Sequence, residues 1–233
     1  LLDDGVSGST AAQAAARGAG LEVFMGGAGD DLISLASNRF LYGGAVLDGG
    51  SGADVLWGNR GADTLLGGAG DDQLAGGGGN DTLDGGAGND FMDGGSGIDA
   101  YLFGRGDGQD RITNLQGAGA QDSLRLKAGI GAGDVSFERV GDDLQVRIAG
   151  STDSITIAGW YLSENNRLAR IETADGTALT PPAAAAVALL VQAMASFAPQ
   201  SAGRTDEAPL SIAHPTQGLT NVWSADGRPA GIG

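Results

Sequence analysis

Residues 49–102 decide the fold of this chain: they read GGSGADVLW, GNRGADTLL, GGAGDDQLA, GGGGNDTLD, GGAGNDFMD and GGSGIDAYL. These six nine-residue units follow one another without a gap, and each has the form G-G-x-G-x-D-x-U-x, in which U is a large apolar residue. A looser seventh copy, GGAGDDLIS, occupies residues 26–34. A period of nine residues excludes both the heptad of a coiled coil and the triplet of collagen.

Each position of the unit has a physical reason. Glycine at positions 1, 2 and 4 permits positive φ, and Asn59, the one departure, is of the type that best tolerates that region after glycine. Three extended residues follow, and only the middle one, at position 8, points inward. We therefore expect an all-β fold, a right-handed parallel β-roll (β-solenoid) in which two units make one turn of eighteen residues. The inward residues are Ile33, Leu56, Leu65, Leu74, Leu83, Met92 and Tyr101.

Position 6 is aspartate in every copy: Asp31, Asp54, Asp63, Asp72, Asp81, Asp90 and Asp99. An eighteen-residue turn stacks each aspartate on the one two units away, at the rung spacing of about 4.8 Å. Two unpaired carboxylates about 4 Å apart repel by about 1 kcal/mol in water, and more when buried. A hard cation between them reverses the sign, and a cage of carboxylates and turn carbonyls suits Ca²⁺. Asp84, at position 9, is expected to point outward, away from any cage.

The ends of the repeat are less regular. Residues 35–48 interrupt the period and place Ala45 where aspartate is expected, so Asp31 has no obvious partner two units on. After residue 102 the run FGRGDGQDRI is two residues out of phase, and realignment places Asp110 at position 6. Asp110 is therefore the candidate that completes the column below Asp90, with Asp107 as the competing candidate.

The nonapeptides resemble the calcium-binding repeats of RTX (repeats-in-toxin) proteins, and FGRGDGQD is similar to the closing turn of such rolls. This resemblance implies that Ca²⁺ is held between same-side loops by the position-6 aspartates and backbone carbonyls, with about four to six ions in all. A glycine-rich disordered linker is the competing interpretation, but such linkers do not keep an aspartate and an apolar residue in register.

From residue 122 to 180 the pattern changes to alternating strands, expected at 123–126, 135–139, 144–148, 154–157 and 170–173. The runs DVSFERVGDDLQVRI, DSITIAGWY and IETADGT resemble the haemolysin-type calcium-binding-related domain that follows RTX repeats. The resemblance implies an antiparallel β region that caps the open edge of the roll. Trp160 and Tyr161 are expected to pack within this cap.

We therefore expect four segments: an N-terminal cap or the end of an upstream domain (1–25), the calcium-binding roll (26–114), the antiparallel cap (115–180), and a helix with a tail (181–233). The helix is expected at 181–198, started by two prolines and stopped before Pro199. It is too short and too rich in alanine for a stable membrane span. The helix either docks on the cap as an amphipathic helix or, by resemblance, forms part of an uncleaved C-terminal secretion signal.

Composition restricts the partners. The net charge of −16 argues against nucleic acid or an anionic membrane, and the lack of cysteine excludes disulfides and thiolate metal sites. Of the 29 acidic residues 24 are aspartate, whose short reach suits a tight loop cage. The single histidine, His214, has no catalytic partner pattern around it, and no nucleophile or phosphate-loop motif is present. We expect no enzymatic activity in this fragment.

The expected function is a calcium-binding module that folds on Ca²⁺ outside the cell and serves type I secretion of a larger protein, with the secretion apparatus as a transient partner. Secretion implies an extracellular or cell-surface location. In the alternative, the chain is the C-terminal part of a secreted lipase or protease whose catalytic domain lies upstream of Leu1, or the anchor end of an adhesin or surface-layer protein. An ice-binding roll is disfavoured because the outward position-7 residues form no threonine or asparagine ladder.

Overall fold

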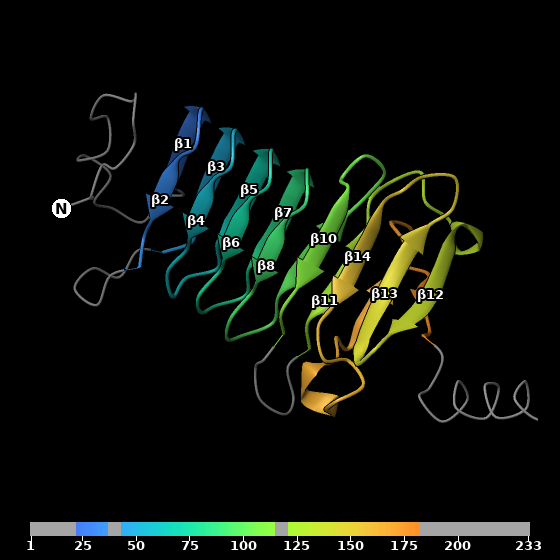
Figure 1. The fold of residues 1–233 in the computed structure, drawn as a ribbon. Coiled ribbons are helices and arrows are strands. Elements are labelled where there is room, and N and C mark those ends of the chain that lie inside the picture. The colour runs from blue at the N-terminus through green and yellow to red at the C-terminus, as the bar shows by residue number, and fades with distance from the viewer. Residues whose placement is uncertain (1–21, 37–42, 115–120, 182–233) are drawn as a thin grey trace, which may run out of the picture. The chain divides into compact units, whose positions relative to one another are not determined.

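The computed structural model describes residues 22–36, 43–114 and 121–181, and they form two eight-stranded sheets (Figure 1). The first sheet contains, in spatial order, β1 (Glu22–Ala28), β3 (Ala45–Ser51), β5 (Thr64–Ala69), β7 (Thr82–Ala87), β9 (Ala100–Phe103), β11 (Ser123–Leu126), β15 (Arg170–Glu172) and β16 (Ala178–Leu179). The second contains β12 (Val135–Val140), β13 (Asp143–Ile148), β14 (Ser154–Ile157), β10 (Gln109–Ile112), β8 (Phe91–Asp93), β6 (Gln73–Ala75), β4 (Val55–Trp57) and β2 (Leu32–Ser34).

The chain alternates between the two sheets, one strand of each per turn, so that all neighbours from β1 to β9 and from β2 to β10 are parallel. This arrangement is the expected β-solenoid. The position-8 side chains fill the space between the sheets: Leu56, Leu65, Leu83 and Met92 are completely buried. Position 7 faces outward, and Phe91 remains 42% exposed. One large apolar residue per unit is therefore enough to build the core.

The interruption at residues 35–48 does not interrupt the sheets. Ala45 pairs with Glu22 of β1, and Val46 pairs with Thr64 of β5, so β3 is a regular rung. Ala45 and Leu47 are both buried. The extra residues lie in the connection before β3, and residues 37–42 of that connection fall outside the described part of the chain. An insertion in a loop thus leaves the register of the strands unchanged.

The antiparallel cap is present: β12 pairs with β13, β13 with β14, and β15 with β16, each antiparallel. Three strands of the same region also extend the roll, because β11 adds to β9, β15 adds to β11, and β14 adds to β10, each parallel. Figure 1 shows the row β8, β10, β14, β13, β12 continuing without a break. The roll therefore passes into the cap through shared sheets.

Two short 3₁₀ turns, η1 (Ala132–Asp134) and η2 (Glu164–Asn166), complete the described elements. Trp160 is buried among the core residues, and Tyr161 is partly buried against them, with the Arg139 guanidinium 4.5 Å above its ring. The expected helix at 181–198 and the expected N-terminal cap lie almost entirely outside the described residues. Within the described part of the chain, no helix is long and apolar enough to cross a membrane.

Candidate metal sites

The aspartate at position 6 directly precedes the short strand of its unit, so the register of the strands decides which aspartates are neighbours. Thr64 of β5 pairs with Thr82 of β7, and Gln73 of β6 pairs with Phe91 of β8. Each aspartate therefore stacks on the one eighteen residues away in the regular turns. Two stacks result, here called the first and the second ladder. The first contains Asp31, Asp54, Asp72, Asp90 and Asp110, and the second contains Asp63, Asp81, Asp99 and Asp122.

In eight of the nine ladder aspartates, one carboxylate oxygen accepts a backbone N–H of the turn above and so holds the turns together. The backbone N–H of Asp54 donates to Oδ1 of Asp72 at 2.7 Å, and the N–H of Asp81 donates to Oδ1 of Asp99 at 2.9 Å. The same bond recurs along both ladders at 2.7 to 3.1 Å. All nine carboxylates are buried, with no residue more than 4% exposed. Oδ1 is thereby used as a backbone cap.

The other carboxylate oxygen has no partner in eight of the nine residues. These buried Oδ2 atoms, which accept no hydrogen bond, belong to Asp31, Asp54, Asp72, Asp81, Asp90, Asp99, Asp110 and Asp122. A buried ionised oxygen without a partner costs several kcal/mol or more, and native proteins pair or coordinate such groups. Eight unpaired oxygens of one kind in two regular columns indicate that each column is built to receive cations.

The position-1 glycine leaves room beside each of these oxygens. A Cβ on Gly76 would lie 2.4 Å from Oδ2 of Asp81 and 2.6 Å from the carbonyl oxygen of Gly94, the position-1 residue of the next turn. The corresponding distance to Oδ2 is 2.2 to 2.6 Å throughout the repeat. A carboxylate oxygen and a carbonyl oxygen from adjacent turns thus converge above a residue that has no side chain. Glycine at position 1 is therefore required by space.

Within the nonapeptide units, positive φ is found only at glycines in positions 2 and 4. Gly77 and Gly79 have φ of 99° and 116°, and a Cβ on either would also strike the carbonyl of the turn above. Residues other than glycine rarely adopt this conformation. The loops therefore stack backbone against backbone, which brings main-chain oxygens close to the ladders.

Burial changes the acidity of the ladder carboxyls. Burial, with a smaller contribution from neighbouring carboxylates, raises the pKa of Asp72, Asp90 and Asp99 to about 6. Burial likewise raises the pKa of Asp81 to about 7 and that of Asp110 to about 8. The backbone N–H bonds to Oδ1 act in the opposite direction but do not prevail. Without a cation, these buried carboxyls are therefore protonated more easily than an ordinary aspartate.

This donor set fits Ca²⁺. Within the described residues, no group of three or more His, Cys, Asp or Glu side chains converges on one point, so an ion between two turns would take one or two carboxylates and complete its shell with main-chain oxygens. Ca²⁺ accepts six to eight oxygen ligands in flexible geometry, and carbonyls are among its ordinary ligands. Metals that prefer nitrogen or sulfur find neither at the ladders.

Asp31 does have a partner, contrary to the expectation from spacing. Its backbone N–H donates to Oδ1 of Asp54 at 2.7 Å across a separation of 23 residues. The inserted residues lengthen the connection before β3 and leave the strand register intact, so that Leu32 pairs with Val55. Asp31 is therefore the top residue of the first ladder.

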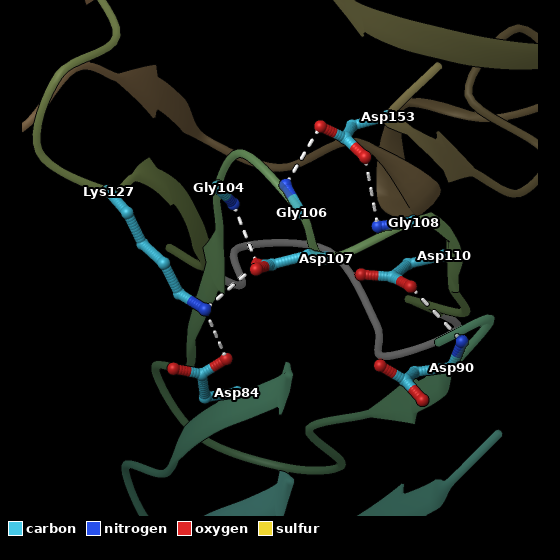
Figure 2. A network of polar contacts seen from close by, with 9 residues as sticks. All are labelled: Asp84, Asp90, Gly104, Gly106, Asp107, Gly108, Asp110, Lys127 and Asp153. Atoms are coloured by element: carbon cyan, nitrogen blue, oxygen red, sulfur yellow. Dashed lines mark hydrogen bonds and ion pairs between the residues drawn. The ribbon is translucent and has the colours of Figure 1, made fainter. Parts of the chain in front are cut away.

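Asp110 and Asp107 take different places at the closing turn (Figure 2). Asp110 receives the backbone N–H of Asp90 at 3.1 Å and completes the first ladder, as its realigned position predicts. Asp107 accepts the N–H of Gly104 at 2.7 Å and lies 2.8 Å from Nζ of Lys127. Asp107 is therefore paired with a cationic side chain and lies outside both ladders.

Lys127 also binds Asp84, a contact that the sequence analysis did not predict. Its Nζ lies 2.7 Å from Oδ1 of Asp84, so one ammonium joins β7 to the closing turn. From the other side, Asp153 of the cap accepts the backbone N–H groups of Gly106 and Gly108 at 2.9 and 3.2 Å (Figure 2). The side chains of Asp107, Lys127 and Asp153 therefore fix this turn.

Asp122 is a ladder member that the sequence analysis did not select. Its Oδ1 accepts the backbone N–H of Asp99 at 2.7 Å, and it extends the second ladder by one turn. The available signal was Asp122-Ser123-Leu124, which repeats the D-x-U order of the unit and buries Leu124. The signal is weak because the glycines before it do not keep the spacing of the repeat.

A further column of caps runs outside the ladders, at position 5. Oδ1 of Asp30 and of Asp71 accept the backbone N–H of Ala53 and of Asn89 in the next turn, both at 2.8 Å. Oδ1 of Asn80 accepts from Ile98 in the same way at 2.9 Å. Aspartate and asparagine serve equally here, so this column needs an acceptor oxygen but no charge.

Comparison with known families agrees with this geometry. A family model described as the RTX calcium-binding nonapeptide repeat (4 copies) matches residues 18–35, 41–74 and 66–101. A second, described as the haemolysin-type calcium binding protein related domain, matches residues 143–181. The first match covers most of both ladders, and the second covers β13 to β16.

Two solved structures are similar at low identity. One is the solution structure of a subunit of the mannuronan C5-epimerase from Azotobacter vinelandii, at 21% identity and a TM-score of 0.37, covering 83% of this chain and 99% of that one. The other is the crystal structure of an extracellular lipase from Serratia marcescens, at 18% identity and a TM-score of 0.29, covering 65% of this chain and 38% of the lipase. Both TM-scores are too low for either similarity to indicate an activity.

Proposed function

We propose that this chain, which is an RTX protein carrying calcium-binding nonapeptide repeats followed by a haemolysin-type calcium binding protein related domain, folds by taking up Ca²⁺ between the turns of its roll. The observation that carries the proposal is the set of eight buried Oδ2 atoms without a hydrogen-bond donor. In each gap between turns, the Oδ2 atoms of the ladder and main-chain oxygens would hold the ion. The ligands proposed from the sequence were Asp31, Asp54, Asp63, Asp72, Asp81, Asp90, Asp99 and Asp110, and the geometry adds Asp122.

The ladders also suggest the number of ions. Seven gaps have an aspartate on each side, four in the first ladder and three in the second. Repulsion between ions in neighbouring gaps opposes full occupancy, so we expect about four to seven ions. Isothermal titration calorimetry with metal analysis of the dialysed protein measures this number. One ion or none would contradict the proposal.

Calcium binding and folding are expected to be one process. Without the ion, burying nine stacked carboxylates and ordering a chain with 44 glycines both oppose the fold. Weak sites with dissociation constants of about 10⁻⁴ to 10⁻³ M fill at extracellular Ca²⁺ levels and stabilise the folded state by mass action. Circular dichroism should therefore change from coil to β on addition of millimolar Ca²⁺ and revert with chelator. A complete β spectrum in excess chelator would show that the core suffices.

The proposed biological role is secretion of a larger protein by a type I apparatus. A chain that stays unfolded in a Ca²⁺-poor cytosol can pass a narrow channel and fold outside, where the ion is abundant. The absence of cysteine is compatible with folding that needs no oxidant. Co-expression with a type I exporter tests the role, because removal of residues 182–233 should abolish the appearance of the chain in the medium. Unchanged export would contradict a C-terminal signal.

This module is proposed to be non-catalytic. Its ladder carboxylates are engaged as caps and candidate ligands, and His214 lies outside the described residues. As an alternative, the module terminates a secreted lipase or protease, or anchors an adhesin or surface-layer protein. A catalytic domain encoded upstream of Leu1 would favour the enzyme, and repeated adhesive domains there would favour the anchor.

A further inference from the structure

One gap in the second ladder differs from all the others. Above Asp63 the ladder position is taken by Ala45, whose backbone N–H donates to Oδ1 of Asp63 at 2.8 Å as an aspartate would. Ala45 is buried and contributes no carboxylate. Asp63 is also the one ladder residue whose Oδ2 has a hydrogen-bond donor. The gap therefore has one carboxylate in place of two, and that carboxylate is already occupied.

The donor is Asn59, the residue that replaces glycine at position 2 of this unit. Its backbone N–H donates to Oδ2 of Asp63 at 2.7 Å, and its Nδ2 donates to Oδ1 of Asp63 at 3.2 Å. The same Nδ2 reaches up to the carbonyl oxygen of Gly43 in the turn above, at 3.3 Å. Its Oδ1 accepts the N–H of Gly61 at 2.6 Å, which fixes the orientation of the amide. Every polar atom of the side chain is thus used.

These contacts reproduce the role assigned to calcium elsewhere in the roll. Between other turns, a carboxylate oxygen and a main-chain oxygen from adjacent turns converge with no donor between them. Here the side-chain amide of Asn59 donates to Oδ1 of Asp63 and to the Gly43 carbonyl in the turn above, and the backbone N–H of Asn59 donates to Oδ2 of Asp63. A cation entering this gap would have to displace the amide and would gain a single carboxylate in return.

We propose that Asn59 substitutes for calcium in the gap between residues 43–45 and residues 59–63, so that this gap of the roll holds its turns together without an ion. The inference rests on the proposed calcium function of the other gaps. In consequence, Asp63 serves only the gap below it, which it shares with Asp81. The two ladders then differ in their dependence on Ca²⁺, because the first ladder has no such substitute among its described residues.

The competing interpretation is that Asn59 is only a turn residue that tolerates position 2. That interpretation assigns no meaning to the bond from Nδ2 to Gly43 or to the alanine at position 45. The substitute role requires both features at once. The two interpretations also predict different numbers of bound ions when the gap is given an aspartate at position 45 and a glycine at position 59, as in the neighbouring turns.

The experiment compares bound ions in the full chain and in the variant Ala45→Asp/Asn59→Gly, which restores the upper aspartate and removes the amide. Anomalous scattering from crystals grown with saturating Ca²⁺ locates the ions, and metal analysis counts them. We expect no ion between Asp63 and the Gly43 carbonyl in the unaltered chain, and one additional ion in that gap in the double variant. Ala53→Asp is the matched control, because it adds the same charge at an exposed position-5 site and should leave the count unchanged.

The outcomes separate this inference from the proposed function. An ion bound by Asp63 and the Gly43 carbonyl in the unaltered chain overturns the substitute role while leaving the calcium function intact. A folded double variant that gains no ion overturns it as well. Absence of ions from every gap of the unaltered chain overturns the calcium function itself. Should the double variant fail to fold, the ion positions in the unaltered chain still decide the question.

Discussion

Each ladder aspartate divides its two carboxylate oxygens between two tasks. Oδ1 accepts a backbone N–H from the adjacent turn, which a neutral side chain of the same shape also does. In eight of the nine ladder aspartates, Oδ2 has no donor and needs a cation. Position 5 shows the contrast, because both aspartate and asparagine occur there as acceptors of a backbone N–H. The hydrogen bonds to Oδ1 therefore do not require a charge at position 6, whereas binding of a cation by Oδ2 does.

The first prediction tests this division at Asp81. Asp81→Asn keeps the acceptor for the N–H of Asp63 and removes the charge from two gaps, so the Ca²⁺ midpoint for folding should rise several-fold. The measurement is a Ca²⁺ titration followed by circular dichroism. Asp71→Asn is the matched control, since its Oδ1 caps Asn89 from an exposed position and its midpoint should hardly change. Equal shifts would mean that the acidity acts only as a diffuse field.

The second prediction concerns the glycine beneath the same carboxylate. Gly76→Ala places a methyl group 2.4 Å from Oδ2 of Asp81, so we expect loss of calcium binding in that gap and a higher Ca²⁺ midpoint. Gly78→Ala is the control at position 3, where the atom nearest to a Cβ is the Ser96 hydroxyl at 3.0 Å and other units carry alanine. A Ca²⁺ titration followed by circular dichroism measures the folding midpoints of the two variants. A midpoint for Gly76→Ala no higher than that of the control would refute the steric role of position 1.

At the scale of elements, the regular strands followed from the sequence and the irregular connections did not. A period of nine with one buried residue per unit fixes the strands, because register requires the position-8 side chain to face the core. A prediction from sequence spacing assumes eighteen residues per turn, but the insertion before β3 lengthens that turn. The pairing of Asp31 with Asp54, 23 residues apart, was therefore not predicted. Asp122 was missed for the same reason at the other end of the roll.

The contacts of Lys127 were beyond sequence reasoning altogether. Its ammonium binds a residue 43 positions away and another 20 positions away, and no local pattern encodes such a distance. What allows these contacts is β11 pairing with β9, which brings the side chain over Gly104 of the closing turn. Side-chain reach across rungs depends on the assembled sheet, so it becomes visible only in three dimensions.

The third prediction tests whether this cation stabilises the closing turn. Lys127→Met leaves Asp84 and the buried Asp107 without their shared partner, so we expect a loss of about 1–3 kcal/mol in unfolding free energy at saturating Ca²⁺. Arg125→Met, two residues earlier, removes an exposed guanidinium from Glu172, which keeps its pair with Arg170, and should cost no more than about 1 kcal/mol. Urea unfolding measures both. Equal losses would show that the half-buried ammonium has no special role.

At the scale of the whole molecule, the two ladders are one electrostatic system built into two continuous sheets. Nine buried carboxylates share the roll with no cationic partner at eight of their Oδ2 atoms, in a chain with a net charge of −16. The cap adds to the same sheets through β11, β14 and β15. Protons and Ca²⁺ are consequently alternative ways to neutralise the interior of the roll, and they should compete.

The last prediction follows from the sign of that competition. Burial raises the pKa of Asp72, Asp90 and Asp99 to about 6, of Asp81 to about 7 and of Asp110 to about 8, above the ordinary value of 3.8. The folded state therefore binds more protons than the unfolded state between about pH 4 and pH 8, and its stability without metal falls as pH rises through that window. In chelator, the β signal in circular dichroism should be larger at pH 5 than at pH 8. At saturating Ca²⁺ this pH dependence should disappear between pH 5 and pH 8, since the Ca²⁺-bound roll and the unfolded chain both carry ionised carboxylates there. A β signal in chelator that does not change between pH 5 and pH 8 would contradict this competition between protons and Ca²⁺.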